Sequence, residues 1–128
     1  MCSHFSQDSL NKLGLRSVPL SDTSLLTCIA NDFGYENTYR RPLDTLLQRD
    51  DLLVSISSSG ESKNILVCAE LALSKSVRLI SLSGFSPKNA LWNTQAHVAF
   101  HVTSTKYGIV ETAHSAIIHC FLEDLYLP

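Results

Sequence analysis

The sequence predicts one α/β domain, a three-layer sandwich in which a parallel β-sheet lies between two layers of helices. The chain has 128 residues, a common length for a single domain. Its hydrophobic content of 45% and charged content of 17% are typical of a folded globular protein. Apolar runs of strand length alternate with amphipathic segments of helix length along the chain. This alternation indicates parallel strands joined by helical crossovers.

The N-terminal part of the chain is predicted to be mainly helical. Residues 2–13 carry apolar side chains at roughly helical spacing, and Gly14 follows as a stop signal. The segment "LRSVPL", residues 15–20, is a candidate strand. Residues 21–34 begin with cap-type residues and end at Gly34, which predicts a second helix. The inward side of this helix is expected to comprise Leu25, Leu26, Ile29 and Ala30.

A third, short helix is predicted within "RRPLDTLLQRDD", residues 40–51. Pro42 stands where a helix could begin, because proline is favoured in the first helical turn. The apolar side of this helix is expected to comprise Leu43, Leu46 and Leu47.

The centre of the chain has the pattern of a strand, a helix and a second strand. The strands are "LLVSIS", residues 52–57, and "VRLISLS", residues 77–83. Between them, residues 62–75 form an amphipathic helix whose apolar stripe comprises Ile65, Leu66, Ala69, Ala72 and Leu73. Such a unit predicts parallel pairing of the two strands with a right-handed crossover.

The C-terminal part of the chain continues the alternation. "SPKNALWN", residues 86–93, offers Ser86 as a cap and Pro87 as a first helical residue, which predicts a short helix. The strand "HVAFHV", residues 97–102, follows. Residues 107–127 then form a long amphipathic helix that ends near the C-terminus.

Charge, hydropathy and cysteine usage exclude several classes of function. Ten basic and twelve acidic residues give a net charge of −2 without a basic stripe, which disfavours nucleic acid as a partner. No segment approaches the length of apolar sequence that spans a bilayer, so no membrane association is expected. The cysteines lack metal-site or redox spacing and fit a reducing cytoplasm; they are Cys2, Cys28, Cys68 and Cys120.

The segment "SSSGES", residues 57–62 and called the serine turn below, lies between a predicted strand and a predicted helix. Hydroxyl groups can donate to phosphate oxygens, and Gly60 allows the backbone to approach an anion closely. The positive end of the following helix also favours an anion. The alternative is an ordinary solvated turn with Ser62 as the helix cap.

Two pairs of histidine and carboxylate residues lie on the first and last predicted helices. His4 and Asp8 are four residues apart and share a helix face, and Glu111 and His119 are eight residues apart on one broad side. Together they could hold Zn²⁺ or provide an acid and a base. The alternative is that the two pairs are unrelated surface residues.

The remaining histidines are expected to be structural. His114 lies three residues after Glu111 and could join the cluster, but a partly buried histidine is the more ordinary interpretation. His97 and His101 share a strand face without a carboxylate companion in the sequence.

Three motifs, "LLVSISSSGESKNIL", "VRLISLSGF" and "YGIVETAHSAIIH", resemble the SIS (sugar isomerase) domain and its phosphoheptose isomerase branch. The resemblance extends over nearly the whole chain. It implies a flavodoxin-like parallel sheet and an aldose–ketose isomerase that acts on a phosphorylated sugar such as sedoheptulose 7-phosphate. It also implies that Ser57, Ser59 and Ser62, with Ser58 between them, bind the phosphate.

The resemblance further implies roles for the histidine and carboxylate pairs. His4 and His119 match two histidines of the family's metal and catalytic set, while Asp8 replaces a glutamate and Glu111 replaces a glutamine. Gly108 stands where the family has an aspartate, which weakens the assignment of the substrate. Asp8 or Glu111 is then the base and His119 the acid. The possible Zn²⁺ ligands are His4, Asp8, Glu111 and His119.

The resemblance also implies that an N-terminal helix, a central strand and a glycine-rich loop precede the matched region in the family. Residues 1–128 are therefore expected to be a single SIS domain that is incomplete at its N-terminus. Most simply the chain is a fragment of a longer protein; the alternatives are that neighbouring strands close the gap or that a partner supplies the missing strand. Family members form homotetramers, so a homo-oligomer is expected. Two other hypotheses stay open: a non-catalytic phosphosugar-binding or adaptor protein, and a truncated product competent only in oligomer contact.

Overall fold

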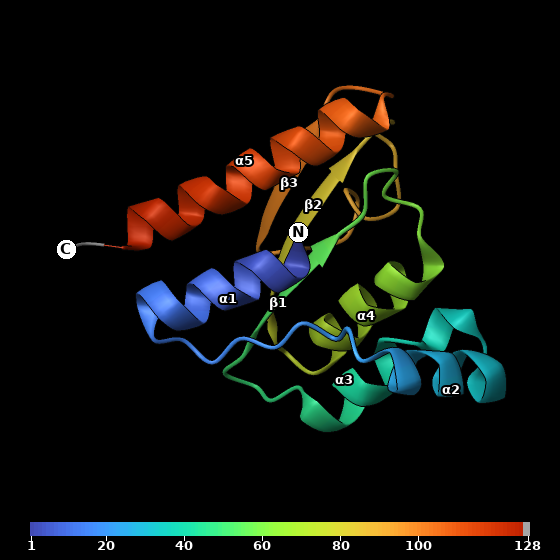
Figure 1. The fold of residues 1–128 in the computed structure, drawn as a ribbon. Coiled ribbons are helices and arrows are strands. Elements are labelled where there is room, and N and C mark those ends of the chain that lie inside the picture. The colour runs from blue at the N-terminus through green and yellow to red at the C-terminus, as the bar shows by residue number, and fades with distance from the viewer. Residues whose placement is uncertain (127–128) are drawn as a thin grey trace.

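The computed structural model describes residues 1–126 and has three layers, with helices on both faces of a parallel sheet (Figure 1). The first face is covered by α1 (Cys2–Leu13) and α5 (Tyr107–Leu125). The opposite face carries α2 (Thr23–Phe33), the 3₁₀ turn η1 (Tyr35–Asn37), α3 (Arg40–Leu46) and α4 (Lys63–Ser74). The strands are β1 (Leu52–Ile56), β2 (Arg78–Gly84) and β3 (Val98–Val102). The predicted α/β sandwich is confirmed.

The three strands are parallel and lie in the order β1-β2-β3. Leu53 pairs with Leu79 between the first two strands, and Leu82 pairs with Phe100 between the second and third. Helix α4 makes the crossover from β1 to β2, as the sequence predicts. Because the strands are parallel, their carboxyl ends lie along one edge of the sheet, where ligands bind in open α/β folds.

Each face of the sheet contributes to its own apolar cluster. Leu79 packs with Ala69 of α4 and with Leu91 on one face, and all three are fully buried. Leu82 of the same strand points to the other face, where it packs with Ile118 and Leu122 of α5. Because side chains alternate between the two faces of a strand, the apolar residues of β2 pack against α4 on one face of the sheet and against α5 on the other.

The predicted segments mostly form the expected elements. The helices predicted at residues 2–13, 21–34, 62–75 and 107–127 are present, with ends within two residues of the predicted ones, although residues 127 and 128 lie outside the described part of the chain. Gly14 ends α1 in the left-handed conformation, with φ of 64°. Helix α3 begins at Arg40, two residues before Pro42, and proline is tolerated there because first-turn N–H groups have no helical acceptor.

Two predicted elements are wrong. Residues 15–20 form extended chain without ladder pairing, and Pro19 there has no N–H to donate to a neighbouring strand. Residues 86–93 form a series of turns instead of a helix. The side chain of Asn89 explains this, because its amide donates to the Ser86 carbonyl and its oxygen accepts from the Trp92 N–H, in competition with helical bonds.

The inward side of α2 also differs from the prediction. Ile29 is buried, whereas Leu25 is 43% exposed. Helix α2 contacts mainly η1 and lies at the outside of its layer (Figure 1). An amphipathic helix without a sheet beneath it has fewer neighbours to cover its apolar stripe.

No helix within residues 1–126 has the length and apolar content that a membrane crossing requires. The longest, α5, has 19 residues and carries Glu111, His114, His119 and Glu123 along its length.

The serine turn is fixed by a close contact between Gly60 and Asn89. Gly60 has a φ of +72°, and a Cβ atom built on it would lie 2.0 Å from the Asn89 Oδ1. The Leu91 N–H donates to the Gly60 carbonyl at 3.0 Å, which holds the two loops together. Only glycine satisfies both the left-handed backbone and the contact.

Gly60→Ala is therefore expected to cost about 2–5 kcal/mol of unfolding free energy, from left-handed strain and overpacking together. Gly14→Ala is the matched control, because Gly14 has a φ of +64° with nothing within 4 Å of the added Cβ. It is expected to lose only about 1–2 kcal/mol. Urea unfolding of the two variants measures the difference. Equal losses in the two variants would show that the contact with Asn89 adds nothing to the cost of Gly60→Ala.

Candidate functional site

The serine turn forms an internal network that still leaves hydroxyl groups available. The buried Ser57 hydroxyl donates to the Ser62 Oγ at 3.1 Å and accepts from the Gly60 N–H at 3.1 Å. The Ser59 Oγ accepts from the Glu61 N–H at 3.2 Å. Ser59 and Ser62 act as acceptors in these bonds, so their hydroxyl hydrogens can still be donated to a ligand.

Ser62 occupies the N-cap position of α4, but its side chain makes no capping hydrogen bond. Asp22 at the start of α2 behaves differently, because its Oδ1 accepts from the Leu25 N–H at 2.7 Å. The first N–H groups of a helix have no acceptor within the helix and favour an anion. Ser62 therefore occupies the N-cap position without a capping bond from its side chain, and the first N–H groups of α4 suit an anion.

The first turns of α5 lie against the serine turn. The Ser58 Oγ lies 3.4 Å from the Glu111 Oε1, across the gap between β1 and α5. Gly84, at the end of β2, permits this approach, because a Cβ there would lie 2.7 Å from Val110 and 3.0 Å from the Ser58 carbonyl. One predicted catalytic residue is thus brought next to the predicted phosphate site.

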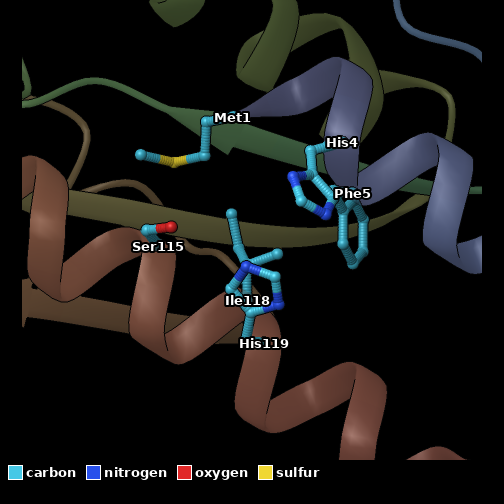
Figure 2. A pocket seen from close by; sticks show the side chains of 6 residues that line it. All are labelled: Met1, His4, Phe5, Ser115, Ile118 and His119. Carbon is cyan, nitrogen blue, oxygen red and sulfur yellow. The ribbon is translucent and has the colours of Figure 1, made fainter.

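A second feature, called the histidine pocket below, lies between α1 and α5 and has a volume of about 200 Å³. The rings of His4 and His119 face each other across it with centroids 5.1 Å apart, in an edge-to-face arrangement (Figure 2). The residues that line the pocket are Met1, His4, Phe5, Ser115, Ile118 and His119. The pocket therefore combines two imidazoles and one hydroxyl with apolar walls.

Asp8 lies behind His4 and does not line the pocket. Its Oδ2 is 3.3 Å from the His4 Nε2, and its side chain is only 15% exposed, against 62% for His4. The same oxygen lies 4.0 Å from the Lys12 Nζ. Asp8 is therefore placed to orient and polarise the His4 ring.

The four candidate metal ligands do not form one centre. His4 contacts Asp8 on one side and His119 on the other, but Glu111 lies about two helical turns before His119, about 12 Å along the helix axis. Within residues 1–126 no group of three or more histidine, cysteine, aspartate or glutamate side chains has an arrangement that could hold a metal ion. This arrangement of side chains does not fit a zinc site.

Sequence reasoning did not single out Ser115 or Asn89. Ser115 lies four residues after Glu111 and four before His119, so the helical period was a signal that could have found it. Asn89 gave no signal, because its role depends on a contact with Gly60 that lies 29 positions earlier.

The other three histidines lie outside the pocket, as expected. His114 is fully buried, and its Nε2 lies 3.0 Å from the Ser83 carbonyl. The His97 Nδ1 accepts from the Leu79 N–H at 3.1 Å. His101 packs against Trp92 with ring centroids 5.3 Å apart.

The similar sequences and the similar solved structures carry the same name, although no protein-family model matches the chain. A phosphoheptose isomerase from Shewanella denitrificans is 32% identical over 129 residues, which covers 95% of this chain and 66% of the relative. One from Histophilus somni is 42% identical over 74 residues, which covers 58% of this chain and 38% of the relative. Solved phosphoheptose isomerases from Francisella tularensis and Neisseria gonorrhoeae both align with a TM-score of 0.88 and 28% identity over 97% of this chain, and over 67% and 68% of their own chains.

A parallel α/β sandwich with a serine turn at the end of β1 is the arrangement expected of a SIS domain. The relatives above narrow this class, and the chain belongs to the phosphoheptose isomerase family. It spans 66% of the length of the Shewanella relatives that it matches.

The burial of His114 predicts a dependence of stability on pH. Burial lowers the pKa of His114 below its ordinary value of 6.5, against the opposing effects of its hydrogen bond to Ser83 and the charge of Glu111. The unfolded chain therefore binds a proton at this histidine more readily than the folded chain does. The stability that the neutral His114 contributes is fully present above pH 6.5 and is lost progressively as the pH falls below that value. The slope from one proton is at most about 1.4 kcal/mol per pH unit.

Urea unfolding at pH 7 and pH 5 tests this effect on the wild type and on His114→Gln, whose amide can replace the donor to Ser83 but does not titrate. The wild type is expected to lose more stability between the two pH values than the variant. An equal loss in both proteins would show that His114 does not contribute to the dependence of stability on pH.

Proposed function

We propose that the chain is the catalytic SIS domain of an aldose–ketose isomerase that acts on a phosphorylated sugar, with sedoheptulose 7-phosphate as its model substrate. The observation that carries the proposal is that the serine turn and the histidine pocket lie along the same helix, α5, through Glu111 and His119. One extended molecule can therefore bind its phosphate at the serine turn and reach the histidines of the pocket with its other end. Relatives named phosphoheptose isomerase support the same reaction.

The phosphate group is proposed to bind at the serine turn. Ser58, Ser59 and Ser62 are partly exposed and supply hydroxyl donors, while the buried Ser57 holds the turn in shape. The N-terminus of α4 adds unpaired N–H groups and the positive end of the helix dipole. Together these groups suit a phosphate monoester.

The reaction is proposed to take place at the histidine pocket. The Asp8–His4 pair takes the proton from the carbon next to the carbonyl, which leaves an enediolate. A proton passes from the neighbouring hydroxyl to the former carbonyl oxygen, and His119 donates a proton to the former carbonyl carbon, so that the carbonyl re-forms on the adjacent carbon. Asp8 is preferred to Glu111 as the source of basicity because it lies beside the pocket, whereas Glu111 is about 12 Å along the helix from His119. An acid and a base that act on adjacent carbons must lie close together. Glu111 is assigned to the part of the substrate near the phosphate.

The proposed reaction assigns no step to zinc. The resemblance implies a metal held by His4, Asp8, Glu111 and His119, but Glu111 contacts Ser58 and Asp8 contacts His4 and Lys12. The proposed proton transfers need only His4 and His119, which line the pocket, and Asp8, which contacts His4.

A cytoplasmic homotetramer is proposed for the assembled protein. Large apolar side chains on α5 support an oligomer, because Tyr107, Ile109 and Leu125 are each more than half exposed. The described cysteines are free thiols, which suits a reducing compartment. Light scattering on the purified chain is expected to give a mass of four chains, and a monomer at micromolar concentration would contradict the proposal.

One observation favours a second candidate, a phosphosugar-binding or adaptor protein without catalysis. Such a protein needs the serine turn but not the full catalytic set that the family resemblance implies, and Glu111 of that set lies at the serine turn, away from the histidine pair. Tight binding of the sugar phosphate without measurable turnover would favour this candidate over the isomerase.

Isomerase assays of three variants test the proposed function. Asp8→Asn and His119→Gln are expected to lower kcat by about a hundredfold or more, because the first removes the carboxylate that makes His4 basic and the second removes the proton donor. Ser59→Ala is expected chiefly to raise KM, since the phosphate is held equally in the ground state and the transition state. Glu111→Gln is the comparison for Asp8→Asn. A larger loss of kcat in Glu111→Gln than in Asp8→Asn would contradict the assignment of the base.

A further inference from the structure

Ser115 supplies the one neutral hydroxyl among the described residues that line the histidine pocket. It is partly buried, and its oxygen is turned toward the side of the pocket where Ile118 and the two histidines lie (Figure 2). The other side chains in the lining are imidazoles, an aromatic ring and aliphatic groups. A polar atom among apolar walls fixes the orientation of a ligand.

The Ser115 hydroxyl makes no hydrogen bond within residues 1–126, although serine and threonine in helices often bond back to a carbonyl one turn earlier. Thr112 on the same helix does so, with its Oγ1 donating to the Gly108 carbonyl at 2.7 Å. Ser9 on α1 likewise donates to the Phe5 carbonyl at 2.7 Å. The hydroxyl of Ser115 is therefore available to a ligand as donor and acceptor.

Ser115 lies midway between the two functional ends of α5. It is one turn after Glu111 and one turn before His119, about 6 Å along the axis from each. A substrate with its phosphate at the serine turn and its reacting carbons at His119 must pass Ser115 with the middle of its carbon chain. In an open-chain sugar phosphate this part carries only hydroxyl groups.

We propose that Ser115 determines specificity by hydrogen-bonding one hydroxyl group in the middle of the substrate's carbon chain. This inference rests on the proposed function and extends it to the class of sugar that is accepted. A site that pairs a substrate hydroxyl discriminates against an analogue without that hydroxyl, because the protein group is then left without a partner. Ser115 thus selects polyol chains with a hydroxyl at the matching carbon.

Steady-state kinetics of Ser115→Ala test the role. KM is expected to rise about two- to tenfold with little change in kcat. This is the effect of losing one neutral hydrogen bond that is equally strong in the ground state and in the transition state. Alanine has the highest helix propensity, so α5 is expected to form in the variant, and thermal unfolding checks this.

Ser115→Cys retains the size of the side chain with a much weaker donor and is expected to show a similar rise in KM. The matched control is Thr112→Ala, which removes a hydroxyl on the same helix that is exposed and bonded to Gly108.

Monodeoxy analogues of sedoheptulose 7-phosphate separate a direct contact from a structural effect. The effect of Ser115→Ala is expected to disappear with the analogue that lacks the contacted hydroxyl and to persist with the others. A penalty that is the same for every analogue, or a Ser115→Ala variant no different from Thr112→Ala, would overturn the inference while wild-type turnover stands. A wild type that turns over no sugar phosphate would overturn the proposed function, and with it this role of Ser115.

Discussion

The close contact between Gly60 and Asn89 is the constraint on which the rest of the site depends. It fixes the left-handed residue of the serine turn against the loop that follows β2, at the carboxyl edge of the sheet. The network of Ser57, Ser59 and Ser62 forms around this fixed point, and α4 begins directly after it. The orientation of the hydroxyl groups therefore follows from packing between two loops, not from the serines alone.

Helix α5 connects this edge of the sheet with the histidine pocket. Its buried residues, including Ile118 and Leu122, pack on the sheet and hold the helix at a fixed distance from β1. Because the helix rises about 1.5 Å per residue, it sets the separation between Glu111 and His119. The apolar core thus defines how far an anion bound at the serine turn lies from the acid–base groups.

Much of the fold could be predicted from the sequence because the central β–α–β unit has strong periodicity. The extended segment at 15–20 and the turns at 86–93 could not be predicted, since one depends on a pairing partner and the other on the side-chain bonds of Asn89. In the site, spacing alone placed His4 next to Asp8. It could not separate Glu111 from His119 in function, because residues on one side of a helix can still contact different parts of a ligand. The role of Ser115 depended on which side chains share a pocket, which sequence spacing only suggests.

The central claim is that the serine turn binds the phosphate of a sugar substrate. Calorimetric titration of the chain with sedoheptulose 7-phosphate, and with sedoheptulose at the same ionic strength, tests it most directly. The phosphorylated sugar is expected to bind at least about tenfold more tightly, since hydrogen bonds to a charged group contribute about 1.5–3 kcal/mol each. Equal affinities for the two sugars, or no binding by a chain that unfolds cooperatively, would contradict the claim.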